Sequence, residues 1–129
     1  MTIKDTNLCF VLEPTPVKQR DDAHPHALTH GDLNTIFNQI IEPSITGRGF
    51  RIVRSSHITR SGNMTREHKD YTSKADLVIA NITTADPIVM FCLALRYAVA
   101  KENPNHSVIG LLDREQVNIF DLPSVIVGP

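Results

Sequence analysis

The segment Ala75-Asp-Leu-Val-Ile-Ala-Asn-Ile-Thr-Thr-Ala-Asp-Pro-Ile-Val-Met-Phe-Cys-Leu-Ala-Leu-Arg-Tyr-Ala98 decides the fold of this chain. Its residues Leu77 to Ile82 are apolar except for Asn81, which is typical of a buried strand. A polar turn follows, and an apolar helix opens at Asp86-Pro87. Open α/β sheets bind ligands where a helix begins at the carboxyl end of a parallel strand. The segment therefore predicts a pocket for an anionic or nucleotide-like molecule.

The rest of the chain continues this alternation of strands and helices. Gly31 opens a helix whose apolar residues lie three and four apart and which ends at Pro43 or Gly47, and a weakly apolar helix runs from Ser61 to Ser73. Further strands are predicted at 8–12, 50–53, 107–112 and 124–127. This order implies right-handed crossovers and a parallel sheet covered on both faces. We expect a flavodoxin-like three-layer α/β sandwich with five parallel strands in the order 2-1-3-4-5.

Length and composition are those of one globular domain. The 129 residues are 41% hydrophobic and 21% charged, and a formal charge of -1 provides no general attraction to nucleic acid or membrane. No apolar run reaches the roughly 20 residues of a membrane-spanning helix, and the first residues lack a signal-peptide core. Cys9 and Cys92 lie in apolar segments, which predicts buried free thiols and a cytoplasmic location. We expect a single domain over residues 1–129, alone or within a longer chain.

Three motifs resemble those of nucleoside 2-deoxyribosyltransferase-like proteins, whose fold is related to that of Toll/interleukin-receptor-like domains. They are Cys9-Phe-Val-Leu12, Ser61-Gly62 at a helix start, and Ala75-Asp-Leu-Val-Ile-Ala-Asn81 followed by Asp86-Pro87 and an apolar helix. The similarity covers about residues 8 to 122 and is strongest over 75–98. Members of this family cleave or exchange N-glycosidic bonds of nucleosides or nucleotides, and some relatives act in nucleotide signalling. The resemblance implies a nucleoside- or nucleotide-like ligand and no cofactor.

Two positions depart from the pattern of that family. Asn81 stands where the strand usually ends in aspartate, and Cys92 stands where the helix usually carries the catalytic glutamate. N-glycosidic cleavage passes through an oxocarbenium-like state that an anionic oxygen stabilises or traps. A thiol in an apolar stripe has a raised pKa and offers little negative charge. The resemblance thus implies a pseudoenzyme, with Cys92 as a weak substitute nucleophile.

Five residues are candidates for holding the ligand. Asp86 either caps the helix that it begins or binds ribose hydroxyls. Asn81 either contacts a base or sugar or fixes the turn that follows. Ser61 and Gly62, with Arg60 just before them, combine backbone amides, a hydroxyl and a guanidinium group, which suit a phosphate or carboxylate.

The remaining polar residues offer weaker chemistry. Glu67 lies on one helix face with Asp70, where it either replaces the missing acid or pairs with cations in solvent. Residues 13–29 form a long loop rich in proline and histidine, which we expect to act as a lid. The histidines His24, His26 and His30 lack the further ligands of a structural zinc site, so no metal is expected.

These observations favour a catalytically degenerate domain that binds a nucleotide or nucleotide-derived ligand as a sensing or interaction module. The alternative is an active N-glycosidase or deoxyribosyltransferase that cleaves nucleosides, nucleotides or NAD, using Cys92 or Glu67. The expected macromolecular partner is a second copy of the chain or a neighbouring domain, since α/β domains of this size often pair through exposed helices.

Overall fold

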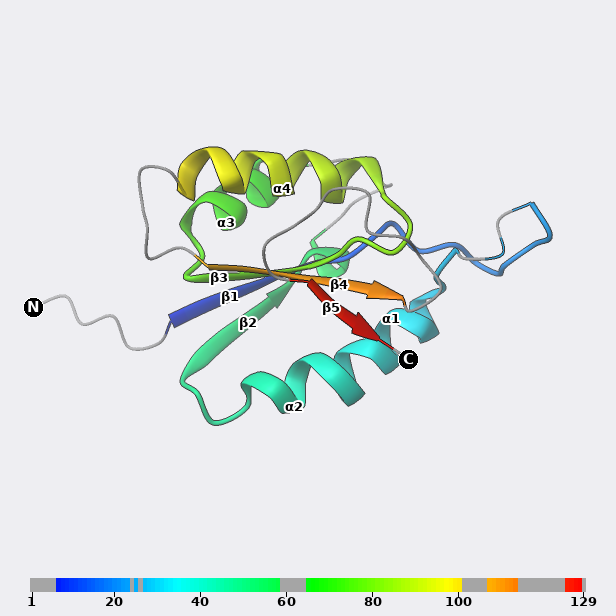
Figure 1. Cartoon of the computed structure of the whole chain (residues 1–129), viewed down its shortest axis with the longest axis horizontal. Coiled ribbons are helices and arrows are strands. Elements are labelled where there is room, and N and C mark those ends of the chain that lie inside the picture. Colours follow the sequence, from blue (N-terminus) through cyan, green and yellow to red (C-terminus); the bar gives the residue numbers. More distant parts are fainter. Residues whose placement is uncertain are drawn as a thin grey trace, which may run out of the picture.

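A parallel β-sheet with helices on both faces forms the framework of the molecule (Figure 1). The computed structural model describes residues 7–23, 25, 27–58, 65–100, 107–113 and 125–128, with the backbone alone at 99–100, 112–113 and 125–128. The strands are β1 (Asn7–Leu12), β2 (Phe50–Arg54), β3 (Leu77–Asn81), β4 (Ser107–Asp113) and β5 (Val125–Gly128). All neighbours pair in parallel, in the order β2-β1-β3-β4 with β5 beside β4. The α/β class and the predicted order of the first four strands are confirmed.

The helices lie in two layers, one on each face of the sheet. The first layer is a continuous helix formed by α1 (His30–Ile36), the π-helical segment η1 (Phe37–Ile41) and α2 (Glu42–Ile45). The second layer is formed by α3 (Arg66–Lys74) and α4 (Pro87–Ala100), while a short 3-10 turn, η2 (Ser55–His57), follows β2. Figure 1 shows the two layers on opposite sides of the strands. Within the described part of the chain, no helix has the length and apolar character needed to cross a membrane.

Alternation of side chains along the central strands builds one core on each face. Phe10 and Leu12 of β1 belong to the core beneath α3 and α4, whereas Cys9 and Val11 belong to the core beneath α1 and α2. All four side chains are fully buried. The strand is therefore apolar at every one of these positions, because successive side chains point to opposite faces and both faces are covered.

The first helix passes through Pro43, one of the two positions at which the sequence pattern predicted that it would end. A proline inside a helix removes one N–H donor and clashes with the carbonyl four residues earlier. Here the turn before Pro43 is widened, and the Glu42 N–H donates to the carbonyl of Phe37, five residues back. The helix ends after Ile45, and Gly47 adopts a φ of 82°, a left-handed conformation that glycine adopts without strain. Of the two predicted stop signals, the position near Gly47 is thus the correct one.

The helix α3 begins at Arg66, and the predicted start at Ser61 lies outside the described residues. Thr65 caps it, since the Thr65 hydroxyl accepts from the His68 N–H at 3.4 Å and His68 Nδ1 accepts from the Thr65 N–H at 3.0 Å. His68 is fully buried, and its ring lies edge-on to Phe10 at 6.5 Å between centroids. The cap therefore places an imidazole inside the core.

Burial lowers the pKa of His68, and this makes the stability of the fold depend on pH. The unfolded chain takes up a proton on this imidazole below about pH 6.5, whereas the folded chain resists protonation. We expect the free energy of unfolding to fall below that pH, by at most about 1.4 kcal/mol per pH unit from this group.

The variant His68→Gln isolates that contribution, because glutamine keeps an acceptor at the capping position without titrating. Urea unfolding of both proteins at pH 7.5 and pH 5.5 measures the effect. The wild type should lose more stability than the variant, and an equal loss in both would refute the assignment.

Candidate functional site

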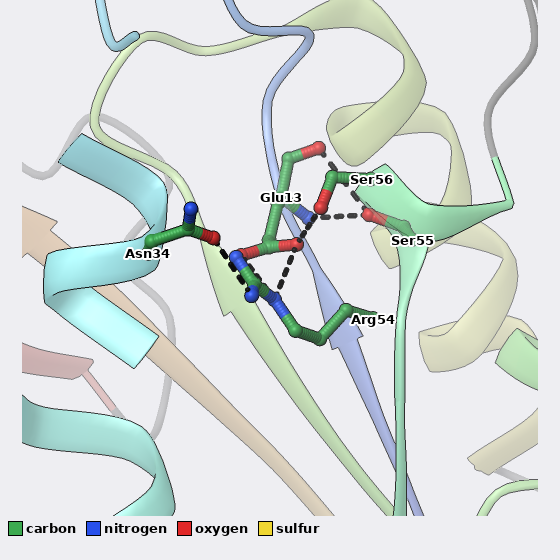
Figure 2. Close-up of polar contacts among 5 residues, drawn as sticks. All are labelled: Glu13, Asn34, Arg54, Ser55 and Ser56. Carbon is green, nitrogen blue, oxygen red and sulfur yellow. Dashed lines mark hydrogen bonds and ion pairs between the residues drawn. The ribbon is translucent and has the colours of Figure 1, made fainter. Parts of the chain in front are cut away.

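A buried polar cluster lies where β1 and β2 end, at the carboxyl edge of the sheet. Glu13 follows β1 directly, and Arg54 is the last residue of β2. The two strands are parallel neighbours, and Val11 is paired with Arg54. Glu13, which lies two residues after Val11, therefore reaches the same edge of the sheet as Arg54. Figure 2 shows the Glu13–Arg54 cluster, which consists of Glu13, Asn34, Arg54, Ser55 and Ser56.

The centre of the cluster is an ion pair held by several hydrogen bonds. Arg54 Nη2 lies 2.9 Å from Glu13 Oε2, and Arg54 Nε lies 3.2 Å from both carboxylate oxygens. Ser56 Oγ donates to Glu13 Oε1 at 2.5 Å, and Arg54 Nη1 donates to Asn34 Oδ1 at 3.0 Å. The guanidinium also lies 4.5 Å from the centroid of the Phe37 ring. Such a bidentate, hydrogen-bonded arrangement holds both charges in one geometry.

Both charged residues are almost removed from solvent, with Glu13 6% and Arg54 8% exposed. The backbone is also fastened here, because the Glu13 N–H donates to Ser55 Oγ at 2.7 Å. Arg54 offers five N–H groups, of which the bonds to Glu13 and Asn34 account for three. A hollow of about 430 Å³ beside the edge strand is lined by Phe37, Asn38, Glu42, Ile52, Val53, Arg54 and His57. Arg54 is thus one of the residues that line this hollow.

Sequence reasoning did not identify this cluster. The sequence pattern places Glu13 only at the start of the predicted loop over residues 13–29. A usable signal was present, because an acid directly follows one buried strand and a base ends the next. Only the strand order places the two side by side.

Asp86 acts as a cap and as a tie between two loops. Its Oδ1 accepts from the backbone N–H groups of Ile88 at 2.9 Å and Val89 at 3.4 Å. Its Oδ2 accepts from the N–H of Thr15 at 2.9 Å, which anchors the loop after β1 to the start of α4. Of the two predicted roles, the structure therefore shows the capping role, and the same carboxylate partly neutralises the helix N-terminus.

Asn81 fixes the turn that leads into α4. It is buried, and its Oδ1 accepts from the N–H of Thr83 at 3.1 Å, the Asx-type bond that stabilises turns. Within the same turn Ala85 has a φ of 51°, a left-handed conformation that is uncommon for a residue with a Cβ. The structural role predicted for Asn81 is the one observed.

The two weak catalytic candidates lie in different surroundings. Cys92 is fully buried in the core beneath α3 and α4, and burial raises the pKa of its thiol. Glu67 is exposed in the first turn of α3, a position that favours acids because of the helix dipole. The predicted ligand residues Arg60, Ser61 and Gly62 lie outside the described residues.

The loop after β1 is fastened at its base. Besides the bond from Thr15 to Asp86, the Val17 N–H donates to the Leu28 carbonyl at 2.9 Å, and Arg20 pairs with Asp32 at 2.6 Å. His24 and His26 lie outside the described residues, and His30 is the exposed first residue of α1. In the described ranges, no group of three or more His, Cys, Asp or Glu side chains is arranged to hold a metal ion.

Both cysteines are free and buried, as predicted, and their reactivity should report this. Burial raises the pKa of the Cys9 thiol to about 12, and that of Cys92 is raised by the same cause. Because the thiolate is the reactive form, we expect a disulfide-exchange reagent at pH 8 to label neither cysteine in the folded protein and both in 8 M urea. Rapid labelling of the folded protein at Cys92, read by mass spectrometry, would show that the thiol faces an accessible pocket.

Comparisons of this chain with protein-family models, curated proteins and solved structures gave no match.

Proposed function

We propose that this chain is a five-stranded, flavodoxin-like domain of the deoxyribosyltransferase-like group that binds a nucleotide or nucleotide-derived ligand without cleaving it. The burial of Cys92 carries this proposal. The resembling family has its catalytic glutamate at this position, whereas here a neutral thiol is fully buried in the core between helix and sheet. The position supplies no negative charge to an oxocarbenium-like state.

The other acids of the described site are occupied by contacts within the protein. Three backbone N–H groups bind the carboxylate of Asp86. Glu13 is neutralised by Arg54 and accepts a hydrogen bond from Ser56. A carboxylate engaged in this way is a poor nucleophile, because attack on a sugar carbon would break its ion pair. The site therefore supports recognition better than bond cleavage.

Two features support binding of an anionic ligand. The first is the sequence Arg60-Ser61-Gly62, which we propose as the phosphate or carboxylate contact. The second is the hollow bordered by Arg54, whose guanidinium has N–H groups beyond those that bind Glu13 and Asn34. A domain with such contacts would act as a sensing or interaction module that responds to its ligand.

Thermal unfolding with and without ligands tests the binding. The probes are AMP, dAMP, NAD, ADP-ribose and deoxynucleosides, each titrated to millimolar concentration. At 100 times its dissociation constant, a ligand stabilises the fold by about 2.7 kcal/mol, which raises Tm measurably. We expect a shift with at least one phosphorylated probe, lost in Arg60→Ala and retained in the matched variant Arg66→Ala, whose exposed arginine begins α3.

Chromatography of the same mixtures tests for catalysis. Release of free base by the wild type would overturn the proposal in favour of an active N-glycosidase, and loss of that activity in Glu13→Gln would place the catalytic acid in the Glu13–Arg54 cluster. Absence of both turnover and any thermal shift would also overturn it, in favour of a domain that binds only macromolecules.

A further inference from the structure

The helix α4 has the reverse of the usual polarity of a surface helix. Only one of its 14 residues is charged, and that residue, Arg96, is fully buried. Arg96 Nη1 donates to the Thr72 carbonyl at 3.0 Å, and Nη2 donates to the Ser107 carbonyl at 3.2 Å. By contrast Phe91 is 51% exposed, and among the described residues it is the only large hydrophobic side chain that is exposed. The helix thus turns its charge inward and an aromatic ring outward.

The outward face of α4 is a continuous apolar stripe. Over residues 87–98, the exposed residues are spaced four, three and four apart and are Pro87, Phe91, Ala94 and Ala98. The buried residues Val89, Cys92 and Leu93 lie on the opposite side with Arg96. Figure 1 shows α4 as the outer layer over its face of the sheet. A surface helix normally carries polar residues on its outer side, and one that is apolar all round is normally covered by another element.

We propose that this stripe binds the same stripe of a second copy of the chain, with the two α4 helices antiparallel. The spacing of its side chains carries the proposal. A twofold axis that passes between Ala94 and Leu95 brings Phe91 of each copy against Ala98 of the other. The large ring then fills the space left by the small side chain, twice in one symmetric interface. The alanines also allow the two helices to approach closely.

Charge supports a second copy as the occupant. The stripe has no charged side chain that would repel its own copy, and none that would select a partner of opposite charge. The adjacent helix α3 supplies a polar rim of both signs, with the exposed residues Arg66, Glu67, Lys69, Asp70 and Lys74. An apolar centre with a mixed polar rim is the usual composition of a protein interface. This inference concerns α4 alone and is independent of the proposed ligand.

Sedimentation velocity over a concentration series tests the dimer. We expect the wild type to dimerise, and we expect Phe91→Lys and Ala98→Glu each to raise the dissociation constant by about 100-fold, because each buries an unpaired charge in the interface. The matched control is Thr35→Lys, which adds the same charge at an exposed position of α1 on the other face of the sheet. It should leave the dissociation constant unchanged, and all variants should keep the wild-type Tm when dilute.

Mixing the two charged variants tests the register. In the proposed interface the lysine introduced at position 91 of one copy would face the glutamate introduced at position 98 of the other, while the second contact keeps its native Phe91 and Ala98. A 1:1 mixture of Phe91→Lys and Ala98→Glu should therefore form a heterodimer, although neither variant forms a homodimer at the same concentration. A wild type that stays monomeric at all concentrations would overturn the proposal, as would single variants that dissociate without rescue on mixing.

Discussion

Replacing Arg54 by methionine is expected to lower the free energy of unfolding by about 3–5 kcal/mol. The variant leaves the Glu13 carboxylate, which is only 6% exposed in the wild type, without its ionic partner. It also removes the hydrogen bond to Asn34 and the contact with the Phe37 ring. Methionine fills a similar length with an uncharged side chain, so the measured loss reports the ion pair rather than a large cavity. Urea unfolding at pH 7, followed by circular dichroism, gives the value.

A double-mutant cycle separates the pair from its surroundings. Glu13→Gln with Arg54→Met should cost clearly less than the sum of the two single variants, because the double variant buries no unpaired charge. Arg51→Met is the matched control, since Arg51 is exposed on the same strand, and it should change stability by less than about 0.5 kcal/mol. Two results would show that Glu13 and Arg54 are not a coupled buried pair. One is a free energy of unfolding for Arg54→Met within about 1 kcal/mol of that of wild type, and the other is a double variant whose loss equals the sum of the two single losses.

Replacing Cys92 by glutamate, the residue that the resembling family carries at this position, is expected to unfold the protein rather than activate it. The side chain at this position is fully buried, and it belongs to an apolar core cluster that includes Phe10, Val78 and Val89. Burying a carboxyl group in apolar surroundings costs several kcal/mol, a large part of the roughly 5–15 kcal/mol that holds a typical domain together. Cys92→Ala, which keeps the site apolar, should lose only about 1 kcal/mol. Circular dichroism melting of the three proteins measures this.

The pH dependence of Cys92→Glu provides a second readout. Burial raises the pKa of a carboxyl group above its unfolded value, so the penalty is smallest when both states are protonated. The stability gap between this variant and wild type should therefore be smaller at pH 4.5 than at pH 8. A variant as stable as wild type that released base from nucleosides would show that position 92 faces a pocket, and the proposed loss of catalysis would be due to one side chain.

The sequence alone determined the class of the sheet and the order of its first four strands. The apolar run at 8–12 and the run at 77–82, which is apolar except for Asn81, are typical of strands covered on both faces, and their alternation with helices favours parallel pairing. Crossover handedness then limits the strand order to few choices. These are local and chain-order properties, so they can be predicted without knowing any contact. The ends of β1, β2 and β3 were each predicted to within one residue.

The tertiary structure decided which polar residues meet. Glu13 and Arg54 are 41 positions apart, and only the pairing of β1 with β2 makes them partners. From the sequence, Asp86 had two possible roles. In the fold, the N–H of Thr15, which is 71 positions away, donates to the second carboxylate oxygen of Asp86. Long-range contacts of this kind follow from packing in three dimensions, and no local pattern of residues specifies them.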